Sequence, residues 1–268
     1  MRADYAATWE AITIWTCART LPLRRARSAT LKTMVVFGPE RSVVQQARLR
    51  RRLLQHHLPL FLLSCSSVAW IYLTRPYKDV VMKASFATAY PALFLLAATL
   101  LIGPLNLLLR RRNPVSIDLR RDLGIWAGIL AIAHTAIGQN VHLRGRPWLY
   151  YIYDHPSRHI LPIRHDVFGL ANYTGALCTL LLILLLATSN DVSLRRLGTR
   201  PWKQLQRWNY AAFALLAIHA LAYEEGIEHQ KIPWFALTIA GLAITLLLQL
   251  AGFLQRRRAR LSASPSGA

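Results

Sequence analysis

The sequence predicts an all-α fold: a bundle of six transmembrane helices with both termini in the cytoplasm. Three observations predict it. Hydrophobic residues make up 54% of the chain, several apolar runs approach or exceed the roughly 20 residues that cross a bilayer, and the basic residues cluster between these runs. A net charge of +21 could also indicate a nucleic-acid-binding protein. Nucleic-acid binding would not explain the long apolar runs, so we expect the chain to interact with a lipid bilayer and not with nucleic acid.

The charge pattern divides the chain into three parts. Residues 1–52 form a basic leader, residues 53–255 the six-helix domain, and residues 256–268 a basic cytoplasmic tail. The apolar piece of the leader is too short to span a membrane, and no cleavage site follows it, so we do not interpret it as a secretory signal. Two interpretations stay open: a disordered or surface-lying segment, or residues upstream of the true start.

The expected spans are residues 58–73, 86–109, 123–141, 167–186, 208–223 and 233–254, of which the first and fifth are the shortest. Alternate flanks of these spans differ in charge. The flanks at 41–52, 110–121, 195–207 and 256–260 hold more than twice as many lysines and arginines as the other loops. Cytoplasmic loops of membrane proteins carry this excess of basic residues, which places both termini inside.

Two of the nine histidines, His134 and His219, lie deep in apolar runs. Each follows the inner end of its helix by 13 residues, counted from Arg121 and from Gln206, which corresponds to a rise of about 20 Å. Both helices run from inside to outside, so the imidazoles reach a similar depth. Two neutral imidazoles facing each other are what a six-coordinate b-type haem requires. A hydrogen bond between helices is the alternative.

Small residues share the helical faces of these histidines: Gly124, Gly128 and Ala131 beside His134, and Ala212 and Ala222 beside His219. They leave room for a flat macrocycle or allow close helix packing, and the sequence does not separate the two. Signature motifs of hydrolases, phosphoryl-transfer enzymes and dinucleotide-binding domains are absent from the sequence, so we expect no catalytic residue of these classes.

One stretch of the chain resembles a known family. The residues are the run from Ala187 to Asn190, then Arg195, Arg196, Leu197, Gly198, Trp202, Lys203, Leu205, Gln206, Arg207, Tyr210 and His219, together with Arg120 and Arg121 ahead of His134. This pattern is similar to the ferric-reductase-like transmembrane family, and above all to its bacterial branch, the haem-binding membrane subunits of protein-methionine-sulfoxide reductase systems. The similarity covers roughly residues 86–250.

The resemblance implies a membrane cytochrome b of the bacterial inner membrane, an electron-transfer subunit of an oxidoreductase system. His134 and His219 match the family's haem ligands in its third and fifth helices. Electrons would come from quinol or a cytosolic flavin reductase and would pass to a periplasmic methionine sulfoxide reductase. The implied cofactors are one haem b and, in addition, FMN or a quinone.

The chain departs from the family at Gln206, where the branch commonly has histidine. Relatives with two haems place a second histidine pair at this inner level, where this chain has Arg120, Arg121 and Gln206. We therefore expect one haem. With Arg207, these residues could hold an anionic group such as a flavin phosphate or a haem propionate, or they could be plain anchors to the inner leaflet.

Two alternative functions stay open at this point. One is a stand-alone transmembrane reductase that uses quinol or reduces ferric iron or another metal. The other is a haem-free membrane scaffold or transporter, in which the histidines serve packing or proton transfer. The prolines of the first two spans have no counterpart in the second half of the sequence, which disfavours a transporter built from related halves.

Overall fold

The computed structural model describes residues 46–47, 49–111, 117–143, 145–229 and 232–263. In chain order the elements are a short π-helical turn η2 (Leu53–His57), α3 (Leu58–Thr74), α4 (Val80–Leu108), α5 (Ile117–Gly138), the single turns η3 (Pro147–Tyr150) and η4 (Pro156–Arg158), α6 (Val167–Thr188), α7 (Asp191–Leu197), α8 (Thr199–Gln206), α9 (Asn209–Glu224) and α10 (Ile232–Ala263). These elements are all helical, so the prediction of an all-α fold is confirmed for the described residues. Most of the expected leader, residues 1–45, lies outside them.

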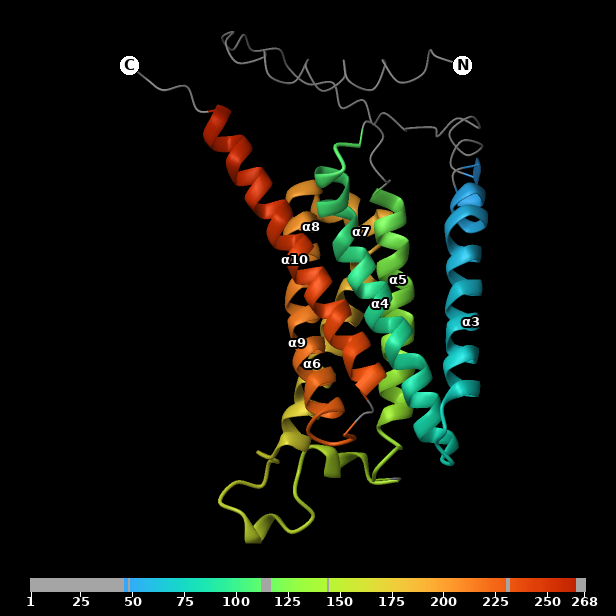
Figure 1. Cartoon of the computed structure of the whole chain (residues 1–268), viewed down its shortest axis with the longest axis vertical. Coiled ribbons are helices and arrows are strands. Elements are labelled where there is room, and N and C mark those ends of the chain that lie inside the picture. The colour runs from blue at the N-terminus through green and yellow to red at the C-terminus, as the bar shows by residue number, and fades with distance from the viewer. Residues whose placement is uncertain (1–45, 48, 112–116, 144, 230–231, 264–268) are drawn as a thin grey trace, which may run out of the picture. The chain divides into compact units, whose positions relative to one another are not determined.

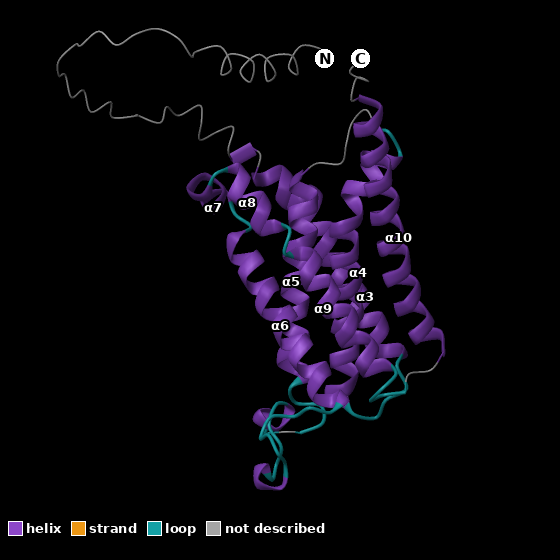
Figure 2. Ribbon diagram, turned by 90° about the vertical axis from the view of Figure 1, so that its left-hand side faces the viewer, coloured by secondary structure: helices purple, strands orange, loops and turns teal. Residues whose placement is uncertain are grey.

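The long helices pack side by side around α4 (Figure 1). This helix contacts α3, α5, α9 and α10, while α6 packs against both α5 and α9. Figure 2 shows the two ends of the bundle from a second direction. The loop between α5 and α6 lies at one end, called here the loop end, and the short helices α7 and α8 lie at the other, called the arginine end.

Each of the six expected spans corresponds to one helix, but only some of these helices have the length and composition of a span. Four stretches of the described residues are long and apolar enough to cross a membrane: 49–74, 80–108, 167–188 and 232–262. The first stretch is longer than expected, because the helix begins before the apolar run. The third and fifth expected spans correspond to α5, whose first turns are charged, and to α9, which has 16 residues.

The outward faces of these helices are apolar, as are their inward faces. The inner cluster includes Leu96 and Leu100 of α4, Ala127 of α5 and Ala212 of α9, all almost fully buried. Outward, large apolar side chains are exposed on α3, α6 and α10; they include Leu62, Leu63, Trp70, Leu73, Leu177, Leu180, Leu184, Leu246, Leu247 and Phe253. Exposed apolar surface of this extent is typical of a protein surrounded by lipid.

A buried ion-pair cluster at the arginine end attaches the first helix to the bundle. Asp122 of α5 has no exposed side-chain surface, and its carboxylate accepts a hydrogen bond from Arg52. It also lies 2.8 Å from Nδ1 of His56 and 3.4 Å from Nε2 of His57. Because a buried carboxylate needs such partners, Asp122 sets the position at which α3 meets α5.

Candidate functional site

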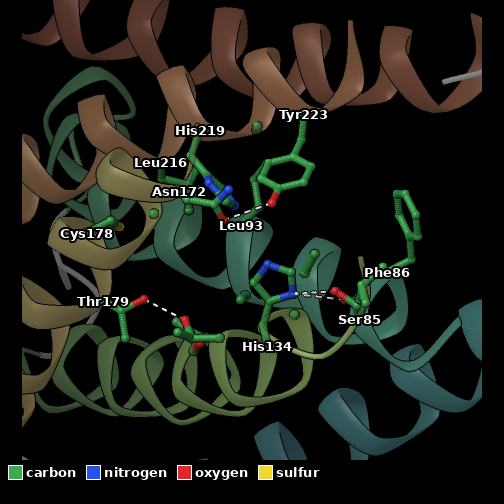
Figure 3. A pocket seen from close by; sticks show the side chains of 18 of the residues that line it. Ser85, Phe86, Leu93, His134, Asn172, Cys178, Thr179, Leu216, His219 and Tyr223 are labelled. Atoms are coloured by element: carbon green, nitrogen blue, oxygen red, sulfur yellow. Dashed lines mark hydrogen bonds between the residues drawn. The ribbon is translucent and has the colours of Figure 1, made fainter. Parts of the chain in front are cut away.

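A cavity between α4, α5, α6 and α9 holds both deep histidines (Figure 3). Its lining extends to the loop end, and it has about 1140 Å³ of empty space, counting its open part. Most of its wall is apolar, with Phe86 and Leu93 from α4 and Leu216 from α9. The structure thus brings together His134 and His219, which are 85 positions apart in the sequence, in a mainly apolar space.

The two imidazoles face each other across this cavity. Their ring centroids are 6.0 Å apart, and the rings stand at 73° to one another. A metal ion held between two imidazole nitrogens, at about 2 Å from each, would separate the ring centroids by about 6 Å. The observed spacing of His134 and His219 therefore suits a pair of axial ligands on one metal centre.

Backbone carbonyls orient both rings. Nδ1 of His134 lies 3.0 Å from the carbonyl oxygen of Ser85, and Nδ1 of His219 lies 2.7 Å from the carbonyl oxygen of Ala171. A carbonyl oxygen only accepts, so each Nδ1 carries the hydrogen and donates it. The tautomer is thereby fixed, and Nε2 keeps its lone pair. This is the arrangement in which histidine binds metals, with the other nitrogen held by a hydrogen bond.

Gly175 of α6 gives His219 the room for this position. A Cβ atom at residue 175 would lie 2.6 Å from Nδ1 and 2.7 Å from Cε1 of the ring. The sequence alone did not indicate Gly175. Its importance becomes visible only in the fold, where α9 lies against α6 and brings the His219 ring close to the Gly175 backbone. Gly124 and Gly128, by contrast, lie near Thr99 and Leu186, so the structure favours helix packing for these two rather than room for a ligand.

The part of the lining nearest the loop end is polar. The hydroxyl of Tyr223 donates a hydrogen bond to the side chain of Asn172, and the Tyr223 ring lies 5.0 Å from that of His219. Nε2 of His142 is 3.1 Å from a carboxylate oxygen of Glu228. His165, in the loop between α5 and α6, does not line this cavity and instead contacts Tyr153.

A second cavity, at the arginine end, has about 1960 Å³ of empty space on the same measure. Its lining includes all four residues of the expected inner site, namely Arg120, Arg121, Gln206 and Arg207, and also Lys203 and Arg256, which the sequence did not indicate for this site. The amide of Gln206 lies 3.5 Å from the hydroxyl of Ser189. The lining of this second cavity therefore carries several positively charged side chains.

Within this second cavity, Arg121 already has an acidic partner. Its guanidinium donates to Asp191 at 2.7 Å and lies 3.7 Å from Asp118. Its Nε is buried and has no hydrogen-bond partner among the described residues. Arg120, Lys203 and Arg256 contribute further positive charge, so the hollow as a whole favours an anion.

Sequence comparisons support the resemblance that the motifs indicated. The chain is 27% identical to the protein-methionine-sulfoxide reductase heme-binding subunit MsrQ of Klebsiella pneumoniae over 187 residues, which cover 69% of this chain and 84% of that protein. It is 29% identical to the protein of the same name from Pectobacterium atrosepticum, over 71% of this chain and 85% of that one.

This chain is similar to the heme-binding subunits of protein-methionine-sulfoxide reductase. The predicted resemblance to the haem-binding subunits of protein-methionine-sulfoxide reductase systems is therefore confirmed. No family model matches the chain, and no solved structure matches it. The identity to these relatives is 27–29%.

Proposed function

We propose that this chain is a membrane b-type cytochrome that relays electrons across the bacterial inner membrane. The observation that carries the proposal is the pair of imidazoles in the apolar cavity, 6.0 Å apart and each with its Nδ1 bonded to a carbonyl oxygen. The names of the relatives support haem as the group that such a pair would bind.

His134 and His219 would hold one haem b through their Nε2 atoms. Bound there, haem supplies reversible one-electron oxidation and reduction. The protein's own contribution is orientation and exclusion of water. The carbonyls of Ser85 and Ala171 hold the two rings in place, and the apolar wall keeps water from the ligand nitrogens. Because the two rings are held in place and water is kept out, the structure around the haem would change little when an electron arrives or leaves.

The proposed topology has six membrane-crossing helices, α3, α4, α5, α6, α9 and α10, with both termini in the cytoplasm. Four of them have the length and composition of a span. The other two carry the histidines: α5 packs against α3, α4 and α6, and α9 packs against α4, α6 and α10. The clusters of arginine at the arginine end support a cytoplasmic location for that end, by the positive-inside rule.

The arginine-end cavity would serve the entry of electrons. Arg120, Arg121, Gln206 and Arg207 would bind an anionic group, either the phosphate of FMN or a propionate of the haem. The donor would be quinol or a cytosolic flavin reductase. The acceptor at the loop end would be a periplasmic methionine sulfoxide reductase, in line with the names of the relatives.

Proteoliposomes test the relay directly. The purified chain is placed in vesicles that contain ferricyanide, and dithionite, which does not cross the bilayer, is added outside. We expect the wild type to reduce the trapped ferricyanide, His134→Ala and His219→Ala to lose this activity, and the loop variant His165→Ala to keep it. Equal rates in all four proteins, or no rate above that of empty vesicles, would contradict the proposed function.

A further inference from the structure

Glu224, the last residue of α9, is a buried carboxylate at the loop end, with 7% of its surface exposed. Its Oε1 accepts hydrogen bonds from the hydroxyl of Tyr90 at 2.9 Å and from the hydroxyl of Thr238 at 2.7 Å. Arg75 in turn donates to the Tyr90 hydroxyl at 3.1 Å, and its guanidinium lies 3.8 Å from the centroid of the Trp234 ring. One carboxylate oxygen is thus held firmly.

The second oxygen of Glu224 has no such partner. Oε2 is buried and makes no hydrogen bond to the described residues, and Glu224 lines the same cavity as His134 and His219. A buried carboxylate oxygen without a donor is unfavourable, and a proton bound to it relieves part of this cost. The two donors on Oε1 keep the group in place in both protonation states. Glu224 can therefore change its charge without moving.

Other titratable groups face this part of the cavity from the neighbouring elements. Tyr90 of α4 and Arg75, which follows α3, lie on one side of Glu224. Nearest the loop end, the cavity is lined by Tyr223 of α9 and by the pair formed by His142 and Glu228. These two polar side chains could pass a proton from the loop end into the cavity. Thr238, the contact from α10, does not titrate.

An electron placed between His134 and His219 adds a negative charge close to Glu224. Glu224 follows His219 by five positions along α9, which corresponds to a rise of about 7.5 Å along the helix axis. At such a separation, in surroundings less polar than water, two negative charges repel each other strongly. Uptake of one proton by the carboxylate removes this repulsion.

We propose that Glu224 binds one proton when the haem of the proposed function is reduced and releases it when the haem is oxidised. The inference rests on that function. In the forward step, a haem held by His134 and His219 would take up one electron from the donor, a quinol or a reduced flavin. Glu224 Oε2 gains one proton from water at the loop end, past His142 and Glu228. The net charge of the cavity is the same before and after, and both particles leave again on oxidation.

The test is a redox titration of the purified, haem-bearing chain, followed by absorbance at a series of pH values. In the wild type, the equilibrium constant for one-electron reduction should fall tenfold per pH unit over the range in which Glu224 titrates, which is about 59 mV per unit. Glu224→Gln, a neutral side chain of the same shape, should remove this dependence. Glu225→Gln, the same change at the exposed neighbour, should keep it.

A wild type whose potential does not vary with pH would overturn the inference, as would equal slopes in the wild type and Glu224→Gln. If Glu224→Gln loses its haem, the reduced-minus-oxidised infrared spectrum decides. The wild type should gain a protonated-carboxyl band on reduction, and Glu224→Asp should show it at a shifted frequency; a wild-type spectrum without the band would refute proton uptake. A chain that binds no haem would instead contradict the proposed function itself.

Discussion

Replacing Gly175 by alanine would place a methyl carbon 2.6 Å from Nδ1 and 2.7 Å from Cε1 of His219. Neither contact can persist, so the ring must move. Its hydrogen bond to the carbonyl of Ala171, now 2.7 Å long, would be stretched or lost. Overpacking in a tight interior costs about 1–3 kcal/mol, and one hydrogen bond contributes about 1 kcal/mol. We therefore expect haem to bind at least about tenfold more weakly, since 1.4 kcal/mol corresponds to a factor of ten.

The assay is haem content per chain after purification, together with the rate at which bound haem is lost to an excess of a haem-scavenging protein. Gly128→Ala is the matched control, because its new methyl group would meet Leu186 at 3.8 Å, an ordinary contact. The control should keep its haem. If Gly175→Ala kept its haem with an unchanged spectrum and loss rate, His219 would not occupy the position described here.

Three further predictions concern other parts of the molecule. Asp122→Asn should cost about 3 kcal/mol of stability, seen as a lower melting temperature in detergent, because it removes the fully buried carboxylate that pairs with partly buried Arg52, whereas exposed Asp154→Asn should have little effect. Burial raises the pKa of Asp166, but its hydrogen bonds and a neighbouring guanidinium outweigh burial and hold this pKa below its usual value. This stabilisation is complete above the unfolded pKa of about 4 and is lost as pH falls through the folded value, so acid melting curves of the wild type should drop more steeply than those of Asp166→Asn. Arg120→Gln should weaken FMN binding about tenfold by fluorescence titration and exposed Arg195→Gln should not; equal affinities would argue against an anion site in that cavity.

Sequence patterns predicted the helices well, because apolar periodicity and charge clusters are local features of the chain. The limits of α4 and α6 differ from the expected ones by a few residues. Larger differences arose where a helix continues into polar sequence. α10 runs on to Ala263, well beyond the expected end at residue 254, and the first helix starts before Leu53. Arginine is a good helix former, so the end of an apolar run does not end the helix.

The sequence also indicated that His134 and His219 would reach the same depth, since both lie the same distance along helices of the same direction. It could not reveal what holds them. The carbonyl partners, Ser85 and Ala171, come from two other helices, and Gly175 matters only because α9 lies against α6. These are contacts between distant segments and leave no local pattern.

Glu224 shows the same limit more clearly. In the sequence it stands beside Glu225 and near Glu228, in an acidic cluster between the fifth and sixth expected spans. The structure instead buries it against Tyr90 and Thr238. Glu224 is buried because of the way α4 and α10 pack against it. The sequence does not show which of the two adjacent glutamates, Glu224 or Glu225, becomes buried.

The most direct test of the central claim, one haem held by His134 and His219, is the haem content of the full-length chain purified from membranes. We expect one haem b per wild-type chain, one per His165→Ala chain, and none in His134→Ala or His219→Ala that still fold, as judged by helical circular dichroism. Two haems per wild-type chain, or haem retained when either deep histidine is replaced, would contradict it.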